Sequence, residues 1–341
     1  MKLNLTERAG LAMNRRTHRL GRMPVLVLMP HSRCNCRCVM CDIWRANANG
    51  RELTEADLAP HLAGLRSFGV RWIVLSGGEA LMHQNLFGLC EQLKPLGARI
   101  TLLSTGLLLR RFAAQIVAHT DDVIVSLDGS PAVHDAIRNV PRAFERLADG
   151  VAALREAQAN FRVTARCVLQ RGNYRDLSGI IDTAKALKLD QLSFLPADCH
   201  SEAFNRPGGW DAARAATVAL SLEEAEQLAV LIKDSLRLSA DDYARGFIAE
   251  SPARMVAIAQ YYLALNGRGE FPPIRCNAPW VSAVIEADGA VRPCFFHPAY
   301  GSLRDDSFDH IVNSPDAHAF RRGLNPTTNP VCRRCVCTLK L

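Results

Sequence analysis

The stretch Pro24-Val-Leu-Val-Leu-Met29, followed by Pro-His-Ser-Arg-Cys34-Asn-Cys36-Arg-Cys38-Val-Met-Cys41, joins an apolar run to a loop with four cysteines. The run is apolar at every position, which is typical of a parallel strand covered by helices on both faces. In parallel α/β folds, ligands bind beyond the carboxyl ends of the strands. The stretch therefore predicts a buried strand that carries thiol side chains to a ligand site.

Outward from this stretch, short apolar runs alternate with amphipathic stretches as far as residue 200. The expected strands are residues 24–29, 72–75, 98–103, 122–127, 162–169 and 191–195. The expected helices are residues 52–68, 85–94, 110–118, 141–157 and 174–187, the first of them capped by Thr54. Such βα units in series predict an α/β fold, a partial (β/α)6 barrel of the TIM type.

The pattern changes after residue 200. A polar loop over residues 197–210 precedes two expected helices, 221–238 and 243–266, the first with a capping box of Ser221 and Glu224. A hairpin follows over residues 281–293 with an Asp288-Gly289 turn, and then a last helix over 308–322. We expect four parts: a basic N-terminal extension (1–23) packed outside the core, the barrel (24–200), a helical linker (201–270) and a small C-terminal domain (271–341).

The composition indicates the compartment of the protein and the partners that it is expected to have. The chain has 341 residues, twelve cysteines and a net charge of +7. No apolar run is long enough to span a membrane, and the N-terminus lacks the apolar core of a secretory signal. We therefore expect a cytoplasmic protein without a membrane segment, in which clustered cysteines bind metal or carry redox chemistry. No basic block is interleaved with aromatic residues, so we expect no nucleic-acid partner. Cys90 and Cys167 stand alone and are expected in the core.

Further polar motifs follow the other expected strands. Ser76-Gly77-Gly78-Glu79 comes after the second, and its glycines would let the backbone approach a ligand closely. Ser104-Thr105-Gly106 comes after the third, and Ser126-Leu-Asp128-Gly129 after the fourth, trailed by His134, Asp135 and Arg138. Arg166 lies on the fifth strand, where its guanidinium can meet a carboxylate.

Taken in strand order, these motifs resemble the radical S-adenosylmethionine (SAM) superfamily over about residues 24–200. The resemblance rests on C-x-x-x-C-x-x-C at residues 34–41, on Gly77-Gly78-Glu79, and on S-L-D-G followed by H-D-x-x-R. It implies that Cys34, Cys38 and Cys41 hold a 4Fe–4S cluster whose open iron binds SAM, and that Gly77, Gly78 and Glu79 hold the SAM amine. The further cofactor-binding residues it implies are Ser104, Ser126, Asp128, Arg138 and Arg166. Two departures are Met40, where the family often has an aromatic residue, and Cys36, which we expect to face away from the cluster.

A second group of cysteines lies in the last quarter of the chain. Cys276, the Gly289-x4-Cys294 hairpin and the Cys332-x-x-Cys335 pair resemble the SPASM/twitch module of many superfamily members. The resemblance implies an auxiliary 4Fe–4S cluster held by Cys276, Cys294, Cys332 and Cys335, with Cys337 as a doubtful fifth thiol. A structural zinc site is the alternative, because zinc also accepts four thiolates.

The resemblance implies reductive cleavage of SAM to a 5′-deoxyadenosyl radical, which abstracts a hydrogen atom from a substrate C–H bond. We expect oxidation, epimerisation or rearrangement of a small molecule such as a sugar, a nucleoside or another natural-product intermediate, because only a short segment precedes the first strand. The alternatives are a maturase of ribosomally made peptides and a non-catalytic iron–sulfur sensor or electron-transfer protein. The expected partner is a reductant such as flavodoxin or ferredoxin. In the loop after the sixth strand, Cys199 is a candidate hydrogen-atom donor and His200 a candidate acid or base.

Overall fold

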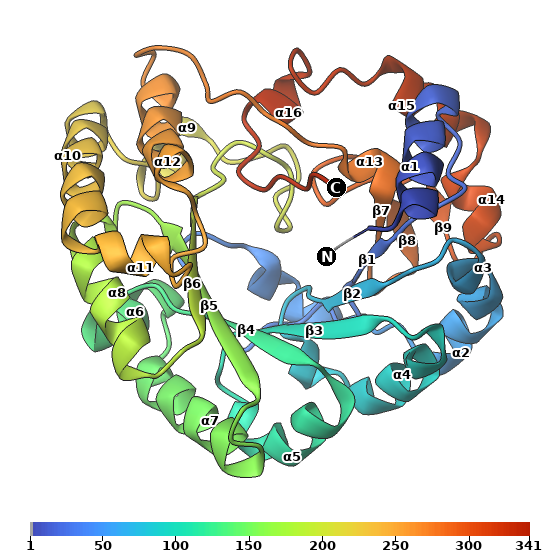
Figure 1. The fold of residues 1–341 in the computed structure, drawn as a ribbon, viewed down its shortest axis with the longest axis horizontal. Helices are drawn as coiled ribbons and strands as arrows, with labels where there is room; N and C mark the ends of the chain where they lie inside the picture. Colours follow the sequence, from blue (N-terminus) through green and yellow to red (C-terminus); the bar gives the residue numbers. More distant parts are fainter. Residues whose placement is uncertain (1–2) are drawn as a thin grey trace.

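A parallel sheet runs through the core of the computed structural model, which describes residues 3–341 (Figure 1). Its strand order is β6-β5-β4-β3-β2-β1-β7-β8-β9, and neighbouring strands from β6 through to β7 pair in parallel. The strands are β1 Val25–Leu28, β2 Trp72–Leu75, β3 Arg99–Ser104, β4 Asp122–Ser126, β5 Arg162–Leu169, β6 Gln191–Pro196, β7 Ser282–Ile285, β8 Ala290–Arg292 and β9 Gly301–Ser302. The expected α/β fold and its six barrel strands are confirmed.

Helices cover the outer face of this curved sheet (Figure 1). Those of the barrel are α2 Glu55–Leu58, α3 Leu62–Ser67, α4 Leu86–Leu93, α5 Leu109–His119, α6 Pro131–Arg138, α7 Ala143–Ala157 and α8 Leu177–Ala186. Short 3-10 turns are η1 Ile43–Asn49, η2 Ala59–His61, η3 Ala80–Met82, η4 Lys94–Leu96 and η5 Tyr174–Asp176. The remaining helices are α1 Leu5–Thr17, α9 Ala212–Ala216, α10 Leu222–Leu238, α11 Ala240–Ala244, α12 Pro252–Leu265, α13 Ala278–Val281, α14 Phe308–Val312, α15 Pro315–Gly323 and α16 Pro330–Arg333.

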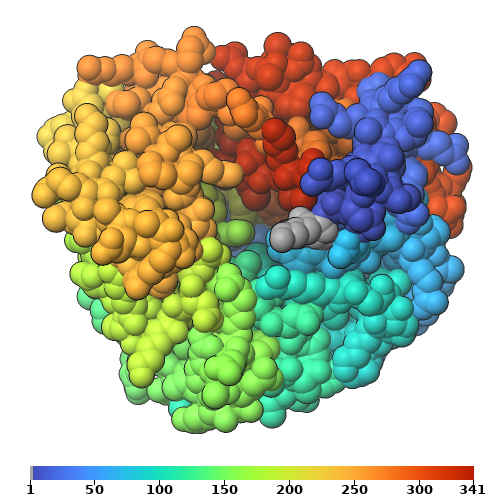
Figure 2. Space-filling model, viewed as in Figure 1, coloured from blue at the N-terminus to red at the C-terminus, as the bar shows by residue number. Residues whose placement is uncertain are grey.

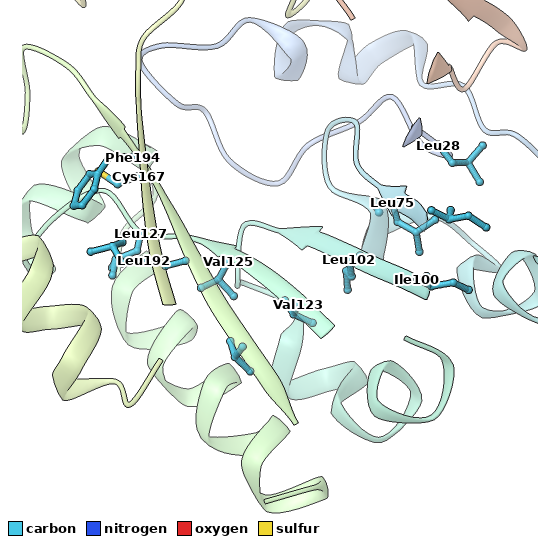
Figure 3. Packing of buried hydrophobic residues seen from close by; sticks show 14 of the residues in the cluster. Leu28, Leu75, Ile100, Leu102, Val123, Val125, Leu127, Cys167, Leu192 and Phe194 are labelled. Atoms are coloured by element: carbon cyan, nitrogen blue, oxygen red, sulfur yellow. The ribbon is translucent and has the colours of Figure 1, made fainter. Parts of the chain in front are cut away.

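The core lies between the sheet and these helices. Figure 3 shows Leu75, Leu102, Val123 and Val125 on adjacent strands, with Cys167 farther along the sheet. Each of these side chains is fully buried. Cys167 and the equally buried Cys90 are core residues, as the sequence predicts, because a free cysteine packs as a small hydrophobe.

Several expected helices are shorter than the sequence pattern indicates. The expected helix 52–68 begins at its Thr54 cap as α2 but breaks at η2, which contains Pro60. The expected helix 243–266 is wrong at its start, because α12 begins at Pro252. The expected helix 308–322 divides into α14 and α15 at Pro315. Proline lacks an N–H and favours the first turn of a helix over its interior, which explains all three breaks.

The C-terminal hairpin extends the sheet of the barrel. β7 and β8 pair antiparallel around Gly289, whose φ of +87° is easy for glycine, so the expected hairpin is confirmed. Unexpectedly, β7 also pairs in parallel with β1, matching Val25 with Ser282. At the other end of the sheet, the backbone of Phe247 and Ala249 bonds to Leu192 of β6. The tail is thus continuous with the barrel through main-chain hydrogen bonds.

The N-terminal segment packs beside the tail. The buried side chain of Asn14 on α1 donates to the backbone oxygens of Trp280 at 2.8 Å and of Arg22 at 2.6 Å. This confirms the expected basic helix on the outside of the barrel. Across residues 3–341, we find no helix with the length and hydropathy needed to cross a membrane.

Candidate functional site

The cysteine loop, residues 30–42, leaves the carboxyl end of β1 and forms one wall of a cavity of about 210 Å³. Cys34, Cys38 and Cys41 all line it. Other predicted cofactor residues share the lining: Gly77, Gly78, Ser104, Ser126, Arg138 and Arg166. The structure therefore brings together, at the carboxyl ends of β1 to β5, side chains that are distant in sequence.

The two glycines after β2 pack against the backbone of the cysteine loop. A Cβ atom at Gly78 would lie 2.1 Å from the carbonyl oxygen of Arg33, and one at Gly77 would lie 2.9 Å from that of His31. Gly77 also has a φ of +110°, and the Glu79 N–H donates to the Arg33 carbonyl at 2.9 Å. Only glycine fits at these two positions, so the motif fixes the loop that presents the thiols.

Glu79 turns away from this cavity. Its carboxyl is fully buried and accepts hydrogen bonds from the Thr105 N–H at 2.6 Å, the Ser104 hydroxyl at 3.0 Å and the Leu81 N–H at 3.3 Å. Burial raises its pKa, against the effect of these donors. Glu79 does not line either cavity described here, so its predicted contact with the SAM amine stays a prediction.

A buried ion pair between Asp128 and Arg138 lies against residues 37–39 of the cysteine loop. Both side chains are at least nine-tenths buried. Arg138 reaches the Cys38 thiol at 3.6 Å, while the carbonyl oxygens of Ile137 and Arg138 accept from the loop backbone. Asp128 does not line the cavity, and it accepts from the Val168 N–H at 3.1 Å. Asp128 thus orients Arg138, and Arg138 reaches the loop.

The environment of Cys38 favours its thiolate. The hydrogen bond from the Cys36 thiol and the positive charge of Arg138 lower the pKa of Cys38 to about 7, against the effect of burial. Burial raises the pKa of Cys34 and of Cys41 to about 12. The Cys36 thiol bonds to Cys38 and does not line the cavity, so the expectation that it faces away from the cluster stays a prediction.

The donor set of this cavity fits a cluster with one open iron. Three thiols are soft ligands suited to iron–sulfur clusters. In the same cavity the Nε of Arg166 is buried and has no hydrogen-bond partner among residues 3–341, so it can receive an anionic group. The residues present therefore match a thiolate-bound cluster with a carboxylate ligand beside it.

A larger cavity of about 1020 Å³ adjoins the first, and the two share Ile43, Gly77, Gly78, Phe204 and Arg206. Its walls come from the loop after β6 and from residues 295–299 after β8. The rings of Phe204, Phe295 and Phe296 meet edge to face, with centroids 4.9 to 6.2 Å apart. The sequence analysis missed this aromatic cluster because its members come from two distant segments.

A histidine and a carboxylate lie together at the edge of the larger cavity. The Nδ1 of His31 is 2.9 Å from the Glu52 carboxyl, and His31 is 3% exposed. Neither ring nitrogen makes a hydrogen bond with good geometry to a residue from 3 to 341, so Glu52 acts on the ring as a nearby charge. Burial lowers the pKa of His31, although the charge of Glu52 opposes the shift. A neutral imidazole beside a carboxylate can act as a general base, and no motif in the sequence indicates this pair.

The predicted residues of the loop after β6 lie in three different surroundings. Asp198 lines the first cavity and pairs with the buried Arg206 at 3.1 Å. His200 is exposed and lines the larger cavity. Cys199 is fully buried in a separate apolar cluster with Ala197, Ala215 and Val218, and it lines neither cavity. Its predicted role as a hydrogen-atom donor would require a rearrangement of this loop.

The tail thiols come from three segments. Cys276 precedes α13, Cys294 follows β8, and Cys332 and Cys335 lie in and after α16. Burial raises the pKa of Cys294 to about 12, and the neighbouring Cys276 and Cys332 raise it further. Cys335 is influenced by Cys276 and Cys294 in the same way. Cys337 is exposed, but it also raises the pKa of Cys335, and its carbonyl accepts from the Cys335 thiol at 2.8 Å. Which four of the five thiols hold the auxiliary cluster therefore stays a prediction.

His297 is a neighbour of these thiols that the sequence analysis missed. Its Nε2 lies 3.3 Å from the Cys332 sulfur, and the ring is 5% exposed. Within residues 3–341, no three His, Cys, Asp or Glu side chains converge tightly enough to form a site for a single metal ion. The thiol geometry alone does not distinguish zinc from an iron–sulfur cluster.

Comparisons with known proteins address that choice. A family model described as the radical SAM superfamily matches residues 28–184, and one described as the SPASM iron–sulfur cluster-binding domain matches residues 276–336. The chain is 26% identical to Fe-coproporphyrin III synthase of Methanosarcina barkeri, over 84% of this chain and 73% of that protein. It is 27% identical to PqqA peptide cyclase of Streptomyces rochei, over 88% and 74%.

A solved structure shares the fold. Streptococcus suis SuiB, in a crystal with its precursor peptide SuiA, superposes with a TM-score of 0.67 at 15% identity. The match covers 96% of this chain and 74% of SuiB. At this identity, the likeness concerns the fold alone.

Proposed function

Because the chain belongs to the radical SAM superfamily and carries a SPASM domain, we propose that it takes a hydrogen atom from a small organic molecule with a flat, conjugated ring system bound in the larger cavity. Its cofactors are a 4Fe–4S cluster, SAM and further iron–sulfur centres of the SPASM domain. The observation that carries the proposal is the shared wall of the two cavities, so that the cavity of the thiols adjoins the one lined by the aromatic cluster; its residues are Ile43, Gly77, Gly78, Phe204 and Arg206. The zinc alternative and the non-catalytic alternative are set aside, because neither accounts for a radical SAM domain.

In this proposal Cys34, Cys38 and Cys41 hold the cluster, and Arg166 binds the carboxylate of SAM. When bound, the cluster supplies the electron that splits SAM into methionine and a 5′-deoxyadenosyl radical. Arg138 and Asp128 keep the Cys38 thiolate in place, and the glycines after β2 keep the loop close to the strand ends. Asp198 and Arg206 form a buried pair at the boundary between the cavities, which orders the wall that a substrate would meet. The main contribution of the chain is the position of the reacting groups and the exclusion of water.

The walls of the larger cavity support the substrate class. Its volume of about 1020 Å³ is at the upper end of the range for small-molecule pockets. Three phenylalanine rings give it an apolar face suited to a conjugated ring system. Two of its arginines are already paired, Arg51 with Asp288 at 3.0 Å and Arg292 with Glu286 at 2.8 Å. Neither relative described above is named for a sugar or a nucleoside, and one is named for a porphyrin.

The proposed reaction class is a two-electron oxidation. After the hydrogen atom has left, the substrate radical must also lose a proton and one electron, and an iron–sulfur centre of the SPASM domain would accept the electron. His31 is suited to accept the proton, because Glu52 stabilises the imidazolium that would form. A peptide maturase is the second candidate function, favoured by the likeness to a peptide cyclase over 88% of this chain and 74% of that protein.

The experiment is anaerobic reconstitution with iron and sulfide, followed by dithionite and SAM. The expected product is 5′-deoxyadenosine, measured by mass spectrometry. Its absence with dithionite and with other strong reductants would overturn the proposal. Cys90→Ala is the matched control, because this cysteine is buried in the core away from both cysteine groups.

A second arm tests the substrate class. Iron-coproporphyrin III and related cyclic tetrapyrroles are compared with short synthetic peptides as additives. A conjugated ring compound that raises 5′-deoxyadenosine formation about tenfold or more supports the small-molecule class. Stimulation by peptides alone would favour the maturase.

A further inference from the structure

A basic surface lies where the N-terminal helix meets the tail. Arg15, Arg16 and Arg19 at the end of α1 are exposed, and so is Arg322 at the end of α15. The Nε of Arg321 donates to the His18 carbonyl at 2.6 Å, and Asn313 bonds to the backbone of Leu20, so the two segments are fixed side by side. Figure 2 shows the blue N-terminal helix beside the red tail on one face of the molecule. We call Arg15, Arg16, Arg19 and Arg322, with His18 and His318, the basic patch.

The charges of the basic patch are not balanced within the protein. None of its four arginines forms an ion pair with any residue from 3 to 341. The two acidic residues of α1 and α15 are Glu7, which pairs with Arg71, and Asp316. Burial lowers the pKa of His318, and the charges of Arg321, Arg19 and Arg322 lower it further. Unpaired like charges carried by two segments that are fixed side by side favour an acidic partner.

Helix α15, which carries Arg322 of the basic patch, also packs against a neighbour of the tail thiols. On α15, Phe320 is adjacent to Arg321 and packs its ring edge to face on His297 at 4.9 Å. His297 in turn lies 3.3 Å from the Cys332 sulfur. One half-buried ring and one imidazole therefore lie between α15, which carries Arg322, and a predicted cluster ligand. Electron transfer falls steeply with distance, so such a position suits electron entry.

We propose that the basic patch docks an acidic electron-carrier protein of the flavodoxin or ferredoxin class, which reduces the iron–sulfur centre of the tail. In this step one electron leaves the reduced carrier, which becomes oxidised, and enters the tail centre, which becomes reduced. The inference rests on the proposed function, because reductive cleavage of SAM consumes one electron, which the reduced tail centre would pass on to the first cluster and so return to its oxidised state. No proton or group is transferred with it.

A second basic surface offers the competing location. Arg33 and Arg37 lie on the cysteine loop itself, and both are exposed. A carrier docked there would reduce the first cluster directly. This loop has fewer exposed arginines without an acidic partner than the basic patch has, which is why the patch is favoured.

The experiment uses the full reconstituted chain and a reduced acidic flavodoxin. The test variant is Arg19→Glu with Arg322→Glu, and the matched control is Arg110→Glu with Arg111→Glu on α5, at the opposite end of the view in Figure 1. We expect the test variant to bind flavodoxin about tenfold more weakly at low salt, with the difference shrinking near 0.5 M salt, where the Debye length is only about 4 Å. The control should bind as the parent chain does. Thermal unfolding checks that both variants fold.

Electron transfer is followed separately by stopped-flow oxidation of the reduced flavodoxin. Cys332→Ala should leave flavodoxin binding intact and slow its oxidation about tenfold or more, because the receiving centre is lost. Dithionite replaces the carrier in a parallel assay, so failure of the parent chain with dithionite counts against the proposed function, not against the docking surface.

Three results would overturn the proposal. Equal flavodoxin affinity of the test and control variants would show that the basic patch is not the docking surface. A larger loss of affinity from Arg37→Glu would place the carrier on the cysteine loop. Tighter binding of a single-stranded RNA than of flavodoxin, lost in the same test variant, would make the basic patch a nucleic-acid surface.

Discussion

The cysteine loop and the tail thiols use the same ligand atom, but the protein builds the two sites in opposite ways. The loop takes Cys34, Cys38 and Cys41 from one short segment at the end of a buried strand. The tail takes its thiols from three segments spread between Cys276 and Cys335. A local motif therefore specifies the first cysteine site, whereas the second site forms only when the tail has folded.

The two sites also differ in how their surroundings treat charge. Cys38 has a buried arginine at 3.6 Å, which favours the thiolate. Cys332 has His297 at 3.3 Å, and burial lowers the pKa of that histidine and thus favours its neutral form. The first site is therefore held by a charged network, and the second by packing and cluster formation.

Cys41→Ala should have the largest effect, because it removes one of three ligands that have no substitute within the loop. We expect about half of the bound iron to be lost and 5′-deoxyadenosine formation to fall below detection. Iron analysis and mass spectrometry measure both. Retained cleavage of SAM would mean that Cys36 replaces the lost ligand.

Cys332→Ala should also remove about half of the iron, but it should leave the first site intact. Dithionite-driven formation of 5′-deoxyadenosine should continue, within about tenfold of the parent rate, because the loop does not depend on the tail thiols. Cys337→Ala is the matched control and should change neither iron content nor rate, since this thiol is exposed. If Cys337→Ala alone loses iron, Cys337 is the ligand.

Arg138→Gln tests whether the buried ion pair between Arg138 and Asp128 stabilises the folded protein. It leaves Asp128 as an unpaired charge in the core, so we expect a loss of about 3–5 kcal/mol in the free energy of unfolding. Arg142→Gln, which breaks an exposed ion pair with Glu145, should leave the free energy of unfolding unchanged. Denaturant unfolding of the protein without iron measures both, and equal behaviour of the two variants would show that the network does not stabilise the fold.

His134→Gln should have the smallest effect, and one confined to acid pH. Burial lowers the pKa of His134 from 6.5 to about 3, and its Nδ1 accepts from the Asp128 N–H at 3.2 Å. Between these two values the unfolded chain binds a proton that the folded chain does not, so stability falls with decreasing pH by about 1.4 kcal/mol per unit. The variant should show a flatter decline below pH 6.5. Leu127→Ala, buried but uncharged, should keep the parent slope.

Much of the barrel follows from local sequence, because buried strands need apolar, β-branched runs. The expected strands 72–75 and 162–169 match β2 and β5 to the residue. The caps Thr54 and Ser221 are also as predicted, since each side chain bonds within its own first turn. The prolines at 60, 252 and 315 are themselves signals of a helix break. The prediction gave more weight to the apolar periodicity and therefore ran the helices through them.

Other features depend on contacts between distant segments. The burial of Cys199 depends on the packing of α9 against the loop after β6, which periodicity does not encode. The aromatic cluster joins Phe204 to Phe295 across the cavity in the same way. The carboxylate partner of His31 comes from an isolated antiparallel bridge between His31 and Glu52. Sequence motifs therefore located the cofactor residues, and only the fold located those of the larger cavity.

The pairing of β1 with β7 has a consequence for synthesis on the ribosome. Val25 emerges early, but its partner Ser282 emerges only when most of the chain has been made. Until then, the strand that leads into the cysteine loop has an open edge, which is prone to pair with other chains. Such long-range pairing slows folding and prolongs the exposure of the edge. When the tail has been synthesised, β7 covers the open edge of β1 beside the first cluster site. The last part of translation therefore protects this strand from aggregation.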